Sequence, residues 1–252
     1  MSRVVLNSVV GGINTDIIPH FFQYYKDIGV DDFYITLNIV ENRYDKLDSV
    51  LGVFKDFNIE PLFIWIGPFS RHLKKRFMEE AMIKCLDNNC WILRADQDEF
   101  VDFGISLKDV VKECEDAKYL YIEGDRLERI TTDGSLPSIK REDDLFKLFP
   151  VKAEIKNDYG YKKGCRQKIV LAKKSVKVCE GAFHILVEDL PLECKYPKIL
   201  NVHHFRWSSD IIRIWDRQTV VKNWRRRINK KRIEYIFIDG KRINMNNVNV
   251  LE

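Results

Sequence analysis

The chain has 252 residues, of which 45% are hydrophobic and 32% charged, which suits one large globular domain or one domain with an appendage. The formal net charge is only +4, so the overall charge gives no case for a nucleic-acid-binding protein. The sequence shows neither a signal segment nor an apolar run of about 18 residues, and we therefore expect a soluble, cytoplasmic protein.

Six cysteines are present and none belongs to a C-x-x-C pair. Most of them lie in apolar surroundings, which is typical of reduced core cysteines in a cytosolic protein. They are Cys85, Cys90, Cys114, Cys165, Cys179 and Cys194.

The first half of the chain repeats apolar runs typical of β-strands. They begin about 29 residues apart, close to the roughly 30 residues of a strand–helix unit. Their starts lie near Val4, Phe33, Leu62, Trp91 and Tyr119. Such repeats build a parallel sheet covered on both faces. We therefore predict an α/β fold, with a Rossmann-like, mostly parallel sheet flanked by helices.

The segments between these runs carry apolar residues at helical spacing. The first predicted helix follows a cap region at 14–16 and ends at Gly29. Three more helices are predicted around residues 47–57, 77–86 and 107–114. Their methionine and aromatic stripes are interpreted as core positions rather than as part of a cofactor site.

After Tyr119 the regular spacing ends, which indicates a mixed C-terminal part. Short strands are predicted at 168–172, 176–178, 182–187 and 199–203, and a helix at 208–223. The expected organisation is one domain over 1–225, with a βα half at 1–123 and a mixed half at 124–225. A basic tail is expected at 226–252.

Three acids follow the fourth apolar run directly: Asp96, Asp98 and Glu99. Open α/β sheets bind ligands at the carboxyl ends of their strands, and buried carboxylates need a partner or a metal. A D-x-D pair suits Mn²⁺ or Mg²⁺ that also binds a diphosphate. A solvated turn is the alternative, which the position after a buried strand disfavours. Glu99 suits a structural role at least as well as a substrate contact.

A diphosphate also needs positive charge and backbone donors. Val10, Gly11 and Gly12 end the first strand, where a nucleotide could approach closely, although a plain turn fits the two glycines equally well. Asn38 ends the second strand. A basic group between the third strand and the third helix could reach phosphates, or form a solvated helix face. It comprises Arg71, Lys74, Lys75 and Arg76, of which we select Arg71 and Lys75.

A second unusual cluster, HHFRW, occupies residues 203–207. His203 could complete a metal site as neutral imidazole, and His204 and Arg206 could contact a phosphate. An ordinary hydrogen-bonded role for both histidines is an equal alternative.

Together these stretches resemble the GT-A glycosyltransferases, specifically a bacterial family 2-like group with a D-x-D-E-F motif. The resemblance covers roughly residues 3–225. Beside DQDEF at 96–100, the stretches that carry it are NTDIIPHFFQYYKDIG at 14–29, GDRLERITTDGSL at 124–136, QKIV at 167–170, GAFH at 181–184 and VHHFRW at 202–207.

The resemblance implies transfer of a sugar, with inversion, from a nucleotide-diphosphate sugar to a hydroxyl of a glycan or lipid-linked acceptor. Asp96 and Asp98 match the family's metal-binding acids, and His203 or His204 its C-terminal histidine. The mixed half would then serve the acceptor. The expected acidic base matches only by approximate spacing, so Asp189 is the first choice and Asp125 the second.

Two other classes of protein stay open. A nucleotidyltransferase also uses acids and metal, but would need a triphosphate-binding loop near the N-terminus. A non-catalytic module could bind a sugar or a protein partner on the same fold. The basic segment 222–232 either contacts an anionic membrane surface or is a solvated helix end.

Overall fold

A computed structural model describes residues 2–12, 15–85, 88–155, 167–179, 185–211, 236–238 and 242–251. The chain forms two compact units. Unit 1 comprises Met1–Asp125 and Gln167–Val202, and unit 2 comprises Arg126–Arg166 and His203–Glu252. This division differs from the expected halves because residues 167–202 return to unit 1.

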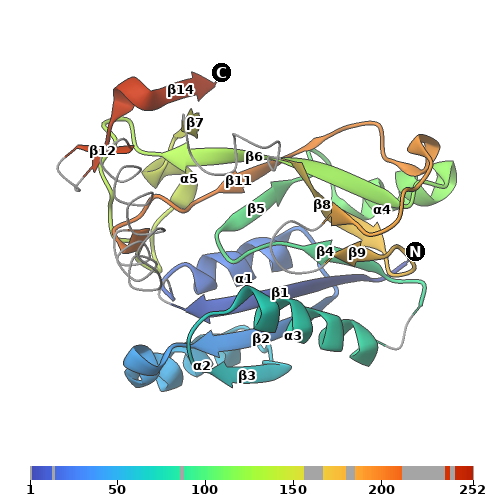
Figure 1. The fold of residues 1–252 in the computed structure, drawn as a ribbon, viewed down its shortest axis with the longest axis horizontal. Helices are drawn as coiled ribbons and strands as arrows, with labels where there is room; N and C mark the ends of the chain where they lie inside the picture. Colours follow the sequence, from blue (N-terminus) through green and yellow to red (C-terminus); the bar gives the residue numbers. More distant parts are fainter. Residues whose placement is uncertain are drawn as a thin grey trace. The chain divides into compact units, whose positions relative to one another are not determined.

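Unit 1 contains four adjacent parallel strands, in the order β3-β2-β1-β4. Figure 1 shows them with helices alongside. Their bounds are Val4–Gly12 for β1, Asp32–Ile39 for β2, Phe63–Ile66 for β3 and Trp91–Arg94 for β4. The four predicted strand starts and the Rossmann-like α/β class are therefore confirmed. The central strands β1 and β4 are buried almost throughout, as their apolar sequences require.

The fifth predicted run forms β6 (Tyr121–Ile130), but β6 does not pair with β4. Strand β8 (Gln167–Lys173) lies between them and is antiparallel to both. The parallel part of the sheet thus ends at β4. The turn at 95–98, which contains Asp96 and Asp98 and is called the acidic turn below, is followed by strand β5 (Glu99–Asp102). Strand β5 pairs with β11 (Leu200–His204) and was not predicted, because it is only four residues long.

Of the short strands predicted after Tyr119, those at 168–172 and 199–203 are present as β8 and β11. The strand predicted at 176–178 shares only Val178 with β9 (Val178–Cys179), and of the strand predicted at 182–187 the described part contains β10 (Ile185–Leu186). Strands β9 and β10 form an antiparallel pair. A short 3-10 helix spans Leu192–Cys194. The predicted helix at 208–223 is described only as far as residue 211, and the segment 222–232 lies outside the described residues.

All four predicted helices are present. They are α1 (Ile18–Asp27), α2 (Leu47–Asp56, after a 3-10 turn at Glu41–Lys46), α3 (Arg71–Lys84) and α4 (Leu107–Ala117). Helix α1 is followed by Gly29, whose φ of 90° and N–H bond to the carbonyl of Lys26 give the expected C-terminal turn. Its N-cap is Ile17, without a side-chain cap, while Asn14 of the predicted cap region lies outside the described residues.

Helix α3 begins earlier than predicted. Its N-cap is Ser70, whose Oγ accepts a hydrogen bond from the N–H of Leu73. The basic group at 71–76 therefore lies in the first turns of α3 and not in a loop before it.

The aromatic face of α1 forms much of the core of unit 1. Phe21, Phe22 and Tyr25 are fully buried, and Phe22 packs edge-on against Phe54 of α2 at 4.9 Å between ring centroids. The hydroxyl of Tyr25 donates to the carbonyl of Glu99 at 2.9 Å. This helix therefore supports the start of β5, directly behind the acidic turn.

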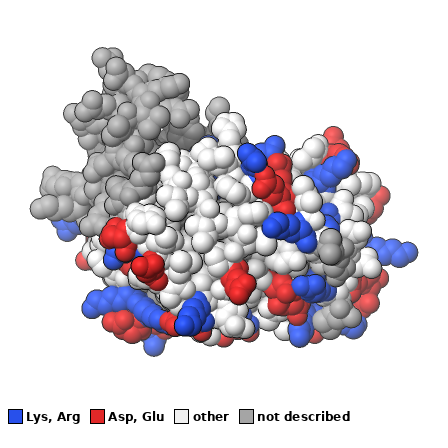
Figure 2. Space-filling model, turned by 90° about the horizontal axis from the view of Figure 1, so that it is seen from below, with Lys and Arg blue, Asp and Glu red and all other residues white. Residues whose placement is uncertain are grey.

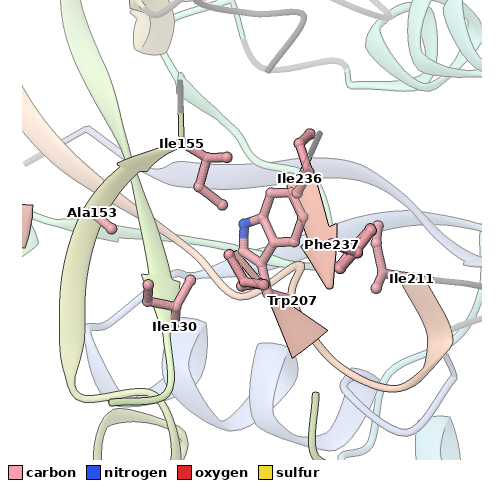
Figure 3. Packing of buried hydrophobic residues seen from close by; sticks show 8 residues of the cluster. Ile130, Ala153, Ile155, Trp207, Ile211, Ile236 and Phe237 are labelled. Atoms are coloured by element: carbon pink, nitrogen blue, oxygen red, sulfur yellow. The ribbon is translucent and has the colours of Figure 1, made fainter. Parts of the chain in front are cut away.

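Unit 2 contains the second half of β6, followed by β7 (Val151–Ile155) and β14 (Val248–Leu251), each antiparallel to its neighbour. Smaller elements are α5 (Leu145–Leu148), β12 (Phe237–Ile238), β13 (Arg242–Ile243) and a 3-10 turn at Met245–Asn247. Its core surrounds Trp207 (Figure 3). The described parts of the expected tail, including β14, thus belong to this unit.

Two further features are the distribution of charged side chains on the surface and the length of the helices. Figure 2 shows acidic and basic side chains interspersed on the face that it draws, in keeping with the small net charge. In the described parts of the chain, no helix is both long and apolar enough to cross a membrane.

Candidate functional site

The acidic turn lies at the carboxyl end of β4, between β4 and β5. The N–H of Glu99 donates to the carbonyl of Asp96 at 2.9 Å, which closes the turn. Asp96, Gln97 and Asp98 are half-buried. Because β4 is parallel to β1, the turn lies at the same edge of the sheet as the end of β1. This is the edge where open α/β sheets bind ligands.

Glu99 is a buried support of this turn, with only 4% of its surface exposed. Its carboxylate accepts a hydrogen bond from the backbone N–H of Asp96 at 2.7 Å and forms an ion pair with Lys168 of β8. Both partners offset the cost of burying the charge. These contacts favour the structural role for Glu99 over a substrate contact.

Asp96 forms an ion pair with Lys74, a residue that we did not select from the sequence. The side chain of Lys74 is 6% exposed, whereas that of Asp96 is 38% exposed. The selected residues Arg71 and Lys75 are exposed, and the ammonium of Lys75 lies 3.6 Å from Glu79. The structure therefore brings Lys74 to the acidic turn.

The sequence contains a pattern that indicates the buried position of Lys74. It precedes Met78 by four residues and Ala81 by seven, and both are buried on α3. Residues at that spacing share one face of a helix. Lys74 thus belongs to the inward face, and its neighbours in the basic group do not.

Gln97, between the two aspartates, holds the end of β1. Its Oε1 accepts from the N–H of Gly11 at 2.6 Å, and its Nε2 donates to the carbonyl of Gly11 at 3.0 Å. Gly11 has a φ of 113°, and a Cβ there would lie 2.0 Å from the carbonyl oxygen of Asn38. Both facts require glycine at this position. Sequence reasoning missed Gln97, since an uncharged residue between two acids carries no signal by itself.

Three further hydrogen bonds join the strand ends along this edge. The amide of Asn38, at the end of β2, donates to the carbonyls of Trp65 and Gly67 at 3.1 and 3.2 Å. The hydroxyl of Ser8 on β1 donates to the carbonyl of Ala95 at 2.7 Å. The strand ends and the acidic turn are therefore fixed relative to one another. The predicted residues gathered along this edge are Val10, Gly11, Gly12, Asn38, Asp96 and Asp98.

The acidic turn offers ligands that suit a hard divalent cation. Two carboxylates lie on a half-buried turn, and carboxylate oxygens are what Mn²⁺ and Mg²⁺ prefer. Among the described residues no group of three or more His, Cys, Asp or Glu is placed to hold a metal. Magnesium-type sites often take only one or two carboxylates and complete their shell with water and substrate phosphates, so the residues present fit such a cation.

The two candidate bases both belong to unit 1. Asp125 is half-buried on β6 and lies opposite Gln167 of β8. Asp189 is exposed, and its neighbour Glu188 forms an ion pair with Lys177 at 2.6 Å. Their role in proton transfer stays a prediction.

In unit 2, His204 belongs to a buried charged cluster that the sequence did not reveal. Its Nδ1 lies 2.8 Å from the carboxylate of Glu128, whose side chain is fully buried. Trp207 donates its indole N–H to the same carboxylate at 2.6 Å, and the Nε of Arg126 lies 3.1 Å from it. Burial raises the pKa of Glu128, but the charges of His204 and Arg126 and the hydrogen bond from His204 outweigh this, so the pKa falls well below its ordinary value.

The neighbouring residues of this cluster are also packed inside unit 2. The ring of His203, which is 6% exposed, meets the ring of Phe146 edge-on at 5.3 Å. The guanidinium of Arg206 lies 5.7 Å from the ring centre of Trp207. The expected roles of His203 at a cation, and of His204 and Arg206 at a diphosphate, stay predictions.

Comparisons with known proteins identify no family for this chain. No family model matches it, and no curated protein matches it. Among solved structures, S. aureus TarS 1-349 aligns at 8% identity and a TM-score of 0.36, over 87% of this chain and 64% of that one. The same protein in complex with UDP gives 7% identity and 0.36, over 86% and 63%. Mannose-6-phosphate isomerase from Helicobacter pylori gives 10% identity and 0.35, over 68% and 71%. The chain spans less than two thirds of either TarS chain, and likenesses at this level carry no functional argument.

Proposed function

We propose that this protein is a glycosyltransferase that moves a sugar from a nucleotide-diphosphate sugar to a hydroxyl of a glycan or lipid-linked acceptor. One observation carries the proposal. The D-x-D turn sits at the carboxyl edge of four parallel strands, clamped to the end of β1 by Gln97, with the nearly buried Lys74 beside Asp96. Two carboxylates and a lysine ammonium at that edge suit a diphosphate that binds together with a metal ion.

The donor would bind along the fixed strand ends. Gly11 and Gly12 have no side chains, so a nucleotide can approach the backbone there. Asp98 and Asp96 would hold Mn²⁺ or Mg²⁺, which when bound stabilises negative charge on the departing diphosphate. Lys74 orients the carboxylate of Asp96 and adds positive charge beside the phosphates.

The acceptor side of the proposal concerns proton transfer. A carboxylate removes the proton of the acceptor hydroxyl while that oxygen attacks the anomeric carbon from the face opposite the leaving group. The sugar is then transferred with inversion. Asp189 is the first candidate for this base and Asp125 the second.

Binding of UDP and of other nucleoside diphosphates, measured by calorimetry with and without Mn²⁺, tests the proposal. We expect binding that requires the cation, that is lost in Asp98→Asn, and that is kept in Asp116→Asn. Asp116 is a matched control because it is an exposed aspartate on α4, paired with Lys112. Equal binding with and without Mn²⁺ in the unaltered protein, or full binding by Asp98→Asn, would refute this cation site.

Release of the nucleoside diphosphate from a panel of nucleotide sugars tests turnover separately. Metal-dependent release that Asp98→Asn abolishes would support a transferase. Metal-dependent binding without release, over a broad panel of donors and acceptors, would instead favour the non-catalytic module.

A further inference from the structure

Two cysteines lie side by side where α3 gives way to β4. Cys85 directly follows the last residue of α3, and Cys90 directly precedes β4. Their sulfur atoms are 3.3 Å apart. Both residues are buried, at 1% and 0% exposure, and belong to a small apolar cluster with Val5 and Ile92.

The backbone on both sides of the pair is held by a single residue. The N–H of Lys174, which follows β8, donates to the carbonyl of Cys90 at 3.0 Å. Its ammonium donates to the carbonyl of Cys85 and lies 3.1 Å from the side-chain oxygen of Asn88. Because one residue binds both carbonyls, the backbones of the two cysteines are held close to each other.

This arrangement is close to the one that a disulfide needs. A disulfide has its sulfur atoms about 2.0 Å apart, so the two sulfurs, at 3.3 Å, must approach by only a little over 1 Å. Side-chain rotation at the two cysteines supplies movement of this size. The exposed residues Asn88 and Asn89 directly precede Cys90, so local opening at these two residues would admit a small reagent.

We propose that Cys85 and Cys90 form a reversible redox site, which closes to an intramolecular disulfide by exchange with a low-molecular-weight disulfide such as oxidised glutathione. One cysteine loses its proton and attacks a sulfur of the oxidant, which forms a mixed disulfide and releases one thiolate. The second cysteine, as its thiolate, then attacks the protein sulfur of the mixed disulfide and releases the second thiolate. Two protein thiols are oxidised, one small disulfide is reduced, and the two protons pass to the released thiols.

The location gives such a bond a structural consequence. Helix α3 carries Lys74 near its start and Cys85 at its end, while Cys90 precedes β4 and Asp96 follows it. The disulfide would thus join the two elements that carry the Lys74–Asp96 ion pair, at the ends opposite that pair. The proposal of a redox site at Cys85 and Cys90 does not depend on the proposed function.

Disulfide mapping of the full-length protein tests the proposal. The reduced, folded protein is equilibrated with glutathione buffers from fully reduced to strongly oxidising, quenched with acid, alkylated under denaturing conditions and digested for mass spectrometry. We expect a Cys85–Cys90 disulfide that grows with the oxidised fraction and disappears again on transfer to reducing buffer. Cys114→Ser is the matched control, since Cys114 is also buried but lies on α4.

The single variants complete the test. Cys85→Ser and Cys90→Ser should show no internal disulfide, and a mixed glutathione disulfide should accumulate on the remaining cysteine of the pair. The proposal is overturned if both cysteines of the unaltered protein are fully alkylated at every buffer ratio while circular dichroism shows the protein folded. It is equally overturned if Cys85 and Cys90 pair with other cysteines and not with each other.

Discussion

Gln97 and Gly11 are joined by two hydrogen bonds that run in opposite directions, one donated by each residue. A side-chain amide can replace a neighbouring strand in this way because it carries both a donor and an acceptor. The acidic turn is therefore attached to the end of β1 through the residue between its two aspartates. If the aspartates hold a cation and the end of β1 holds a nucleotide, Gln97 sets the distance between them.

Replacing Gln97 should weaken donor binding more than it weakens the fold. In Gln97→Glu the carboxylate can no longer donate to the carbonyl of Gly11 and instead faces it with negative charge. We expect the dissociation constant for Mn²⁺ and UDP to rise roughly tenfold, the effect of about 1.4 kcal/mol. Calorimetry measures it, and Gln23→Glu, an exposed glutamine on α1, is the control. An unchanged dissociation constant would show that the clamp does not position the donor site.

Gly11→Ala should destabilise the protein as well as the site. The new Cβ would lie 2.0 Å from the carbonyl oxygen of Asn38, and the φ of 113° is strained for any side chain. Gly12→Ala is a matched control, because its φ is also positive, at 71°, but no atom lies within 4 Å of a Cβ there. We expect a loss in unfolding free energy of about 1 kcal/mol for Gly12→Ala and of several kcal/mol for Gly11→Ala. Urea unfolding compares them, and equal losses would contradict the close approach of β2.

The strand–helix alternation of unit 1 was predictable because each element is encoded locally. Short apolar runs predict the strands β1 and β4, and apolar residues at helical spacing predict α1. The place of β8 between β4 and β6 was not predictable, since pairing partners far apart in sequence leave no local pattern. The same holds for Glu128 and His204, which are 76 residues apart. A lone glutamate within a strand does not indicate which histidine it will meet.

Lys74→Met should separate the two interpretations of the basic group on α3. The change removes the ion pair between the Lys74 ammonium and the carboxylate of Asp96, and a hydrogen bond to a charged group contributes about 1.5–3 kcal/mol. We therefore expect the KM for the donor, or its dissociation constant, to rise by about tenfold or more. Lys75→Met, an exposed neighbour on the same helix, should change it little. If Lys75→Met weakened donor binding more than Lys74→Met, Lys75 and not Lys74 would be the residue that contacts the donor.

The buried cluster of unit 2 should make stability depend on pH through Glu128. Burial raises the pKa of Glu128, but the charges of His204 and Arg126 lower it by a larger amount. The pKa in the folded protein is therefore below the pKa in the unfolded chain. A carboxyl group whose folded pKa is lowered contributes stability above its unfolded pKa, and this contribution is lost as the pH falls through the folded pKa. We therefore expect Glu128→Gln to lower the unfolding free energy at pH 7 by about 3–5 kcal/mol, because it removes the buried negative charge that His204 and Arg126 face.

Urea unfolding between pH 7 and strongly acidic pH tests this expectation. The difference between Glu128→Gln and the unaltered protein should shrink as the pH falls below the ordinary range of a glutamate. Glu188→Gln is the control, since Glu188 is an exposed partner of Lys177. A difference that stays constant with pH would mean that the variant acts through packing and not through the charge.

Glu99 and Lys168 offer a test of how the acidic turn is held. Glu99→Gln alone leaves the ammonium of Lys168 buried without its counter-charge, and Lys168→Met alone leaves the carboxylate of Glu99 in the same position. The losses of unfolding free energy in the two single variants should therefore add up to more than the loss in the double variant, by a coupling of about 0.5–3 kcal/mol in a double-mutant cycle. Glu99→Gln keeps an oxygen that can accept from the N–H of Asp96, so its loss should be the smaller of the two. If the single losses simply add, Glu99 holds the turn through the backbone of Asp96, and Lys168 has no part in it.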